Sequence, residues 1–134
     1  MAETVWVVLV DDSQEFRSLL SSILHAKPEF RVVAQASNGH EAVQKIEALA
    51  PDLVLLDLGL PELNGLEVAR IMRDKSASRK ILIVSQESSP EVVDEALRLG
   101  ACGYVLKSDV ENELLRAVSA VLQGKTFLSK TLGR

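Results

Sequence analysis

The stretch VVLVDDS, residues Val7 to Ser13, decides the fold, because four apolar residues lead directly into two adjacent carboxylates. An apolar run of this kind is typical of a strand that is buried on both faces of a parallel sheet. Asp11 and Asp12 then stand at the end of the strand, where two charges about 4 Å apart repel by about 4 kcal/mol at an effective dielectric constant of about 20. This position is costly for an acidic pair, and it indicates a function that uses closely spaced negative charge.

Short apolar runs alternate with helical patterns along the rest of the chain. The predicted strands are VWVVLV (5–10), FRVVAQA (30–36), DLVLLD (52–57), KILIVS (80–85) and CGYVLK (102–107). Apolar residues recur at the spacing of amphipathic helices over residues 16–24, 42–49, 66–72, 90–99 and 110–122. Strict alternation of strands and helices predicts a (βα)5 fold of the α/β class, a doubly wound parallel sheet of five strands with helices on both faces.

Helix ends are predicted from residues with capping chemistry: short polar side chains that accept hydrogen bonds from the first turn, and glycine after the last turn. These are Asn38 before Gly39, Ser89 before Pro90, Gly100 as a stop, and two pairs with capping-box spacing, Asp12 with Glu15 and Ser108 with Glu111.

Length and composition fit one soluble domain with a hydrophobic core. The chain has 134 residues, 47% of them hydrophobic and 25% charged, and its net charge is −4. This charge gives no general attraction to nucleic acid or to an anionic membrane, and no apolar run approaches the ~18 residues of a membrane span. The single cysteine, Cys102, and the absence of a signal-peptide pattern predict a cytoplasmic protein. Residues 123–134 show no period, so we expect a domain over 1–122 followed by a linker start or a frayed tail.

Polar side chains follow four of the predicted strands. Asp57 ends the third, Ser85 the fourth and Lys107 the fifth, as Asp11 and Asp12 end the first. The carboxyl ends of parallel strands share one edge of the sheet, where open α/β sheets bind ligands, so we expect these side chains to lie together. A turn or capping role explains any one of them, but such roles do not require a lysine and three aspartates at one edge.

The residue types predict phosphoryl chemistry at this edge. Three carboxylates without a cluster of Cys or His fit Mg²⁺, which binds carboxylate and phosphate oxygens. The Lys107 ammonium and the Ser85 hydroxyl suit a phosphoryl group. Asp57 is a candidate nucleophile because carboxylates form aspartyl phosphates, and the transfer needs mainly positioning and charge neutralisation.

Together these segments resemble the receiver domain of two-component response regulators. The resemblance rests on VLVDDS (8–13), LVLLDLGLPELNGLEVAR (53–70), ILIVS (81–85) and GACGYVLKS (100–108), and it covers about residues 5–122. The NGLEVAR and GACGYVLKS segments look most like the NarL/FixJ (LuxR-type) subfamily, whose receivers precede a helix-turn-helix DNA-binding domain. The resemblance implies a flavodoxin-like sheet of strand order 2-1-3-4-5, and no DNA-binding domain lies within this chain. The chain is then either a receiver fragment or a stand-alone receiver.

The resemblance also implies how the acidic residues act. Asp57 would take a phosphoryl group from a sensor histidine kinase or from a small phosphodonor. Asp12 and Asp57 would bind Mg²⁺ directly. Asp11 would act largely through water, and Gly59 through its backbone carbonyl.

The remaining site residues would bind the phosphoryl group or report its presence. Lys107 and Ser85 would contact its oxygens, and Tyr104 would change rotamer together with Ser85. Access to Asp57 and hydrolysis of its phosphate would depend on Gln86, Glu87 and Gly59, and the loop after the third strand would be shaped by Pro61 and Gly65.

The resulting hypothesis is a switch domain rather than an enzyme. It would assist its own phosphorylation and dephosphorylation, and phosphorylation would change its self-association as a homodimer or its contact with another domain. It would control transcription in the full-length protein, with DNA bound only through the missing domain and with no membrane partner.

Three alternatives stay open on the residues alone. A phosphatase of the haloacid-dehalogenase type needs a second Asp two residues after the nucleophile, where this chain has Gly59. A flavodoxin-like electron carrier shares the fold class, but DDS is a poor phosphate loop. A degenerate receiver that acts as a constitutive interaction module is favoured by Gln86, which stands where a small residue is common, and disfavoured by the complete set of acidic residues and lysine.

Overall fold

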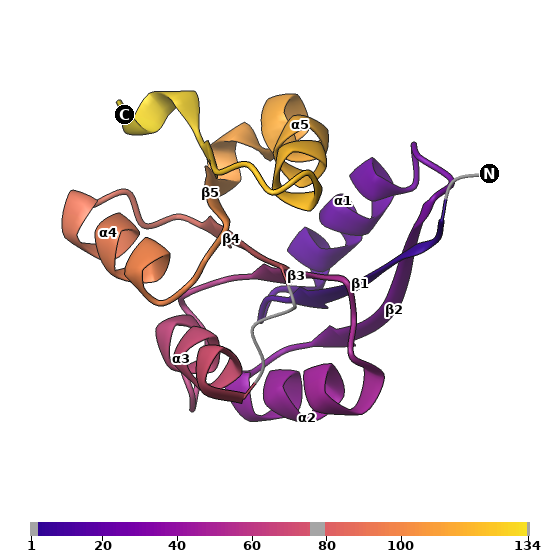
Figure 1. The fold of residues 1–134 in the computed structure, drawn as a ribbon, viewed down its shortest axis with the longest axis horizontal. Helices are drawn as coiled ribbons and strands as arrows, with labels where there is room; N and C mark the ends of the chain where they lie inside the picture. The colour runs from indigo at the N-terminus through magenta and orange to yellow at the C-terminus, as the bar shows by residue number, and fades with distance from the viewer. Residues whose placement is uncertain (1–2, 76–79, 134) are drawn as a thin grey trace.

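The computed structural model describes residues 3–75 and 80–133, and its strands form one parallel sheet (Figure 1). The elements in chain order are β1 (Val5–Val10), α1 (Gln14–Leu24), β2 (Phe30–Ala36), α2 (Gly39–Leu49), β3 (Leu53–Leu56), α3 (Gly65–Lys75), β4 (Lys80–Ser85), α4 (Pro90–Arg98), β5 (Gly103–Leu106), the 3-10 helix η1 (Lys107–Asp109), α5 (Val110–Leu122), β6 (Phe127–Leu128) and the 3-10 helix η2 (Lys130–Leu132).

The strand order is β2-β1-β3-β4-β5-β6. This confirms the predicted doubly wound order of five strands and adds a sixth. Three strands have the predicted bounds, whereas β3 and β5 are each one residue shorter at both ends. The helix predicted over 66–72 extends further, because α3 continues to Lys75.

The helices cover the two faces of the sheet in two layers. In Figure 1, α1 and α5 lie on one side and α2, α3 and α4 lie on the other. Each layer encloses its own apolar core: Leu20 and Leu24 of α1 pack with Leu114 and Val118 of α5 over one face, and the other three helices share a second core with Val8 and the rest of the opposite face. Strands buried on both sides explain the nearly continuous Val, Leu and Ile runs.

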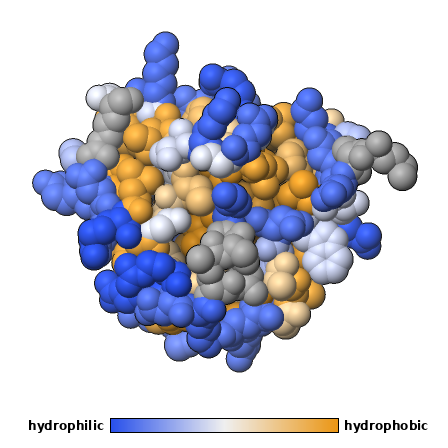
Figure 2. Space-filling model, in the orientation of Figure 1, coloured by the Kyte–Doolittle hydropathy of each residue, from blue (hydrophilic) through white to orange (hydrophobic). Residues whose placement is uncertain are grey.

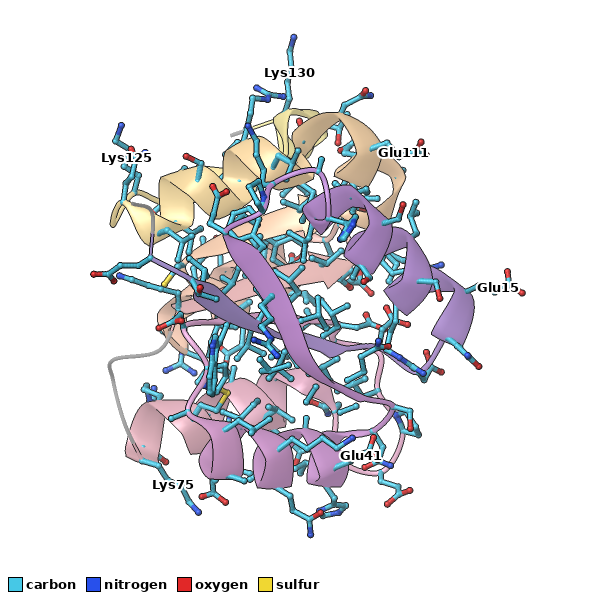
Figure 3. All side chains as sticks on the ribbon, turned by 90° about the vertical axis from the view of Figure 1, so that its right-hand side faces the viewer. Glu15, Glu41, Lys75, Glu111, Lys125 and Lys130 are labelled. Atoms are coloured by element: carbon cyan, nitrogen blue, oxygen red, sulfur yellow. The ribbon has the colours of Figure 1, made fainter. Side chains whose placement is uncertain are left out.

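Charged side chains lie on the outside of these layers. In Figure 3 the labelled side chains Glu15, Lys75 and Glu111 point away from the sheet. Figure 2 shows apolar residues toward the centre of the visible face and hydrophilic residues around them. The helices are therefore amphipathic, as their sequence spacing predicts.

Two of the predicted caps are confirmed. The Asn38 side chain accepts a hydrogen bond from the amide of Glu41 at 2.9 Å, and Ser89 Oγ accepts from the amide of Val92 at 3.4 Å. Gly100, with φ of 104°, follows the end of α4 and adopts the left-handed backbone that favours glycine.

Two other caps were wrong. Ser13, not Asp12, caps α1, because its Oγ accepts from the amide of Phe16 at 3.1 Å. Ser108 does not cap α5, because it lies inside η1 and the helix begins after Asp109, whose side chain makes no capping hydrogen bond. Asp12, which does not cap α1, instead lines the cleft described below.

The segment after α5 contains a short strand and a 3-10 helix that the sequence did not predict. Phe127 and Leu128 form β6, which pairs in parallel with β5. A two-residue strand carries no detectable sequence period, so its pairing depends on tertiary contacts. The part of the chain that the structure describes has no helix long and apolar enough to cross a membrane.

Candidate functional site

The predicted site residues meet at the carboxyl edge of the sheet. Asp11 and Asp57 directly follow the adjacent strands β1 and β3, Ser85 ends β4, and Lys107 follows β5. The amide of Asp57 donates to the Val10 carbonyl at 3.0 Å, which continues the β1–β3 ladder to the start of the loop. The sheet therefore fixes the backbone from which each of these side chains leaves.

The three carboxylates form one cluster. One oxygen from each of Asp11, Asp12 and Asp57 lies within 4.8 Å of the others. Asp11 is 1% exposed and Asp57 is 5% exposed, whereas Asp12 is exposed. Two buried like charges at this separation require compensation by a cation or a proton.

Lys107 supplies part of that compensation. Its Nζ lies 2.7 Å from Asp11 Oδ2 and 3.3 Å from Asp57 Oδ2. Burial of Lys107 opposes its charged form, but the two carboxylates outweigh this effect and raise its pKa. The ammonium also lies 4.6 Å from the centre of the Phe16 ring, a cation–π contact that holds it over the site.

One oxygen of Asp11 contacts the backbone of the next loop, and the other contacts Lys107. Its Oδ1 accepts a hydrogen bond from the amide of Ser13 at 2.8 Å. Its Oδ2 is buried and lies 2.7 Å from Lys107 Nζ, whose charge compensates it there. Three carboxylates within 4.8 Å of one another, two of them buried, fit a hard divalent cation such as Mg²⁺.

Asp57 binds protons more readily than an ordinary aspartate. Burial is the main cause of its raised pKa, and the nearby Asp11 charge raises the pKa further. The amide of Gly59, which donates to Asp57 Oδ1 at 3.2 Å, and the Lys107 ammonium act in the opposite direction. A perturbed carboxylate in a cleft, with a specific cationic partner, is a candidate for covalent chemistry.

The loop after β3 lies directly against this aspartate. A Cβ on Gly65 would stand 2.2 Å from the carbonyl oxygen of Asp57, so only glycine permits the approach of α3 to the strand end. The amide of Gly65 donates to the Leu58 carbonyl at 3.1 Å and closes the loop. In contrast, a Cβ on Gly59 would meet the Asp57 carboxylate only at 3.9 Å, so this glycine leaves the carboxylate uncovered.

Ser85 and Tyr104 are connected through one peptide segment. The hydroxyl of Tyr104 donates to the Glu87 carbonyl at 2.6 Å, and the amide of Glu87 donates to Ser85 Oγ at 3.1 Å. Tyr104 is fully buried, and this burial raises its pKa. Ser85 and Tyr104 thus hold the backbone of the same residue, Glu87, from its two sides.

A cleft with a volume of about 550 Å³ opens over Asp57. Gln86 and Glu87 form part of its rim and are exposed. The other lining residues are Asp12, Ser13, Asp57, Leu58, Gly59, Asn64, Leu66, Ser85, Val92 and Lys107. The cleft is wide enough for a small anion and its hydration shell.

Two residues at the site were not predicted. Phe16 was interpreted only as part of the apolar stripe of α1, and its contact with Lys107 joins residues far apart in the sequence. Arg17 Nη1 donates to the backbone carbonyl of Asp11 at 2.6 Å, and its Nε donates to Gln35 Oε1 at 2.9 Å. Their places one turn after the acidic pair give no sequence signal, since helix residues at such positions are usually structural.

The comparison with protein families excludes two of the three alternatives. The family described as response regulator receiver domain matches residues 7–119. The chain belongs to this family. The match excludes a haloacid-dehalogenase-type phosphatase, which Gly59 already disfavoured. It also excludes a flavodoxin-like electron carrier, which the DDS loop already disfavoured.

Relatives of this receiver domain place it with the LuxR-type regulators. It is 38% identical over 130 residues to the nitrate/nitrite response regulator protein NarL of Escherichia coli K12, covering 97% of this chain and 60% of that protein. It is 38% identical over 124 residues to the DNA-binding transcriptional activator DevR/DosR of Mycobacterium tuberculosis, covering 92% of this chain and 57% of that protein. The chain thus spans about three fifths of the length of these curated relatives.

Solved structures agree with this placement. A LuxR-family two-component response regulator from Aurantimonas sp. SI85-9A1 has a TM-score of 0.92 and 32% identity, covering 98% of this chain and 94% of that one. The signal receiver domain of the putative response regulator NarL from Mycobacterium tuberculosis has a TM-score of 0.87 and 33% identity, covering 92% of this chain and all of that one. The flavodoxin-like receiver fold and the NarL/LuxR subfamily are therefore shown.

Proposed function

We propose that this receiver domain is a phosphorylation switch in which Asp57 accepts a phosphoryl group. The observation that carries the proposal is the position of Asp57, which is buried in a cleft with two further carboxylates within 4.8 Å and the Lys107 ammonium at 3.3 Å. This arrangement supports a nucleophile, a cation site and a charge partner for a phosphoryl group in one place.

In this proposal the phosphoryl group passes directly from the donor to Asp57. An Asp57 carboxylate oxygen forms a bond to phosphorus while the bond from phosphorus to the donor breaks, and the electron pair remains on the donor, a histidine nitrogen of a sensor kinase or the oxygen of a small acyl phosphate. Lys107 moves its charge toward the phosphoryl oxygens and keeps Asp11 paired. The domain thereby assists its own phosphorylation and, when water attacks phosphorus, its own dephosphorylation.

Mg²⁺ is the cofactor that we propose for this step. The carboxylates of Asp11, Asp12 and Asp57 and the backbone carbonyl of Gly59 would hold it. When bound, the ion neutralises charge on the phosphoryl oxygens. The closeness of the three carboxylates, within 4.8 Å of one another, and their mutual repulsion support this assignment.

The switch would act through Ser85 and Tyr104. A phosphoryl group on Asp57 offers new acceptor oxygens and about two negative charges. Ser85 would turn its hydroxyl toward them and release the Glu87 amide, and the Tyr104 hydroxyl would then lose its present geometry at the Glu87 carbonyl. This connection supports a change in the surface formed by α4, β5 and α5.

Three residues would set the rates of this cycle. Gln86 stands at the rim of the cleft and would restrict the approach of bulky donors. Gly59 places no side chain over the Asp57 carboxylate, which leaves the phosphate open to water. The side chain of Glu87, at the same rim, would repel anionic donors.

We propose that a histidine kinase is the physiological donor, and that the output is homodimerisation and transcription control in the cytoplasm. DNA would be contacted through a helix-turn-helix domain outside residues 1–134. The printed names of NarL and DevR/DosR, which describe a response regulator and a DNA-binding activator, support this proposal.

Treatment with acetyl phosphate and Mg²⁺, followed by intact-mass measurement, tests the function. We expect one added phosphoryl mass in the wild type and none in Asp57→Asn. An unchanged wild-type mass with several donors would instead favour the degenerate interaction module.

A further inference from the structure

The C-terminal segment, residues 127–132, is attached to the strand that presents Lys107. β6 pairs with β5 through Gly103 opposite Phe127 and Tyr104 opposite Leu128. The amide of Ser129 then donates to the Tyr104 carbonyl at 2.9 Å. In Figure 1 this last part of the chain lies beside β5 and α5.

The side chain of Ser129 continues the ladder where the backbone of the C-terminal segment turns away. Its Oγ accepts a hydrogen bond from the amide of Leu106 at 2.9 Å, and Ser129 is fully buried. Leu106 is the last residue of β5 and precedes Lys107 in the chain. Without this hydroxyl, the last amide of the strand would lose its partner at the point where the lysine begins.

Glu113 of α5 holds Ser129 in place. Its Oε1 accepts from the Ser129 hydroxyl at 2.7 Å, and its Oε2 accepts from the amide of Lys130 at 3.2 Å. Glu113 is only 7% exposed, although it occupies a position in the buried stripe of α5 where an apolar residue would cost less to bury. Both oxygens of a buried carboxylate are thus directed at the C-terminal segment, while the side chain of Lys130 points outward (Figure 3).

We infer that Ser129 and Glu113 are positioning residues for Lys107, and that the C-terminal segment is the element that couples phosphorylation to the chain beyond it. This inference rests on the proposed function. Ser129 fixes the end of β5, and β5 fixes where the ammonium meets Asp11 and Asp57. Because coupling between two sites is reciprocal, movement of Lys107 toward a phosphoryl group must act back on the segment.

Ser129→Ala removes the hydroxyl that joins the segment to β5. We expect amide hydrogen exchange at Leu106 and Lys130 to become about tenfold faster and phosphorylation by acetyl phosphate to slow about fivefold, since a small misplacement of a charge partner costs rate. The dissociation constant for Mg²⁺ should stay within about twofold, because Ser129 contacts none of the three carboxylates. If Ser129 had a purely structural role, Ser129→Ala would lower the stability of the protein, but it would not slow phosphorylation while leaving Mg²⁺ affinity unchanged.

Two further variants sharpen the test. Ser119→Ala is the matched control, since it removes a hydroxyl on the same helix as Glu113 that accepts a hydrogen bond from the exposed Gln123 at 3.3 Å, and it should change none of these readouts. Glu113→Gln retains an acceptor for the Ser129 hydroxyl but cannot accept from Lys130 with its amide nitrogen. Its phosphorylation rate should therefore lie between those of the wild type and Ser129→Ala. If Ser129→Ala does not fold, Glu113→Gln tests the same connection in its place.

Beryllofluoride with Mg²⁺ tests the reciprocal effect on the wild type. We expect amide exchange over residues 127–130 to change when this phosphoryl mimic binds. Unchanged exchange there, or a wild-type phosphorylation rate in a Ser129→Ala protein whose Leu106 amide exchanges faster, would overturn the inference. A wild type that no donor phosphorylates would instead overturn the proposed function, and the exchange data on the unphosphorylated variants distinguish the two failures.

Discussion

Asp57→Asn should stabilise the Mg²⁺-free protein at neutral pH, although it removes the residue on which the proposed function depends. The substitution keeps the shape of the side chain and removes its charge. Asp57 is 5% exposed, and its pKa is raised mainly by burial and also by Asp11. The folded state therefore holds this carboxylate in an unfavourable charged form.

The magnitude follows from the distances around Asp57. At an effective dielectric constant of about 20, attraction to Lys107 at 3.3 Å is about 5 kcal/mol and repulsion from Asp11 at up to 4.8 Å is about 3.5 kcal/mol. These largely offset each other, so the loss of hydration decides the sign. Removal of this desolvation penalty should raise the free energy of unfolding by about 1–3 kcal/mol.

The sign of the pH dependence follows from the raised pKa. Below about pH 4, the ordinary range of an aspartate, Asp57 is protonated in both folded and unfolded states, so the substitution has little effect. As the pH rises through the raised pKa of the folded state, the wild type loses stability that Asp57→Asn retains. The difference between the two proteins should therefore grow with pH and then level off.

Urea unfolding at several pH values, without and with Mg²⁺, measures these effects. Mg²⁺ at about 100 times its dissociation constant should stabilise the wild type by about 2.7 kcal/mol and the variant by much less, which reverses their order. Asp74→Asn, an exposed carboxylate on α3, is the control and should change stability by less than about 0.5 kcal/mol. A less stable Asp57→Asn protein at neutral pH without Mg²⁺, or an equal difference at pH 3 and pH 7, would refute the reasoning.

Three more predictions follow from single positions. Ala50→Gly should raise the free energy of unfolding by about 1 kcal/mol, about 3 °C in thermal unfolding, because Ala50 ends α2 in the left-handed region with φ of 47°; no gain would contradict the strain. Gly65→Ala should destabilise by at least about 2 kcal/mol in urea unfolding, because its Cβ would stand 2.2 Å from the Asp57 carbonyl oxygen; wild-type stability would contradict that packing. Lys107→Gln should bind Mg²⁺ at least as tightly as the wild type in calorimetry, since a competing cation leaves Asp11, yet acetyl phosphate should phosphorylate it about a hundredfold more slowly; a wild-type rate would contradict the role of the ammonium.

The architecture could be predicted because strand burial and helix amphipathicity are periodic in the sequence. The nearly continuous apolar runs of β1 and β4 predicted the correct bounds of these strands. Alternation with helices predicted the parallel sheet, and the family resemblance implied the correct order of its first five strands. β6 could not be predicted, because its two residues pair with β5, and the residues after it are held by the Tyr104 carbonyl and by Glu113, which only the folded chain brings near.

The site could be predicted in its residues but not in its connections. The chain order of aspartates, serine and lysine at strand ends placed them at one edge, and the structure brings them together there. The cap of α1 was wrong because Asp12 and Ser13 are both competent caps, and only the path of the chain decides which one faces the helix. Phe16 and Arg17 were missed because their contacts with Lys107 and with the Asp11 carbonyl cross between elements.

The central claim is that Asp57 is the phosphorylated residue. Acyl phosphates are reduced by borohydride to alcohols, so reduction after treatment with acetyl phosphate and Mg²⁺ converts a phosphorylated aspartate into homoserine. Peptide mass mapping should find homoserine at position 57 and at no other aspartate, with Asp11 and Asp12 unmodified. Homoserine at another position, or its absence throughout the chain, would contradict the account.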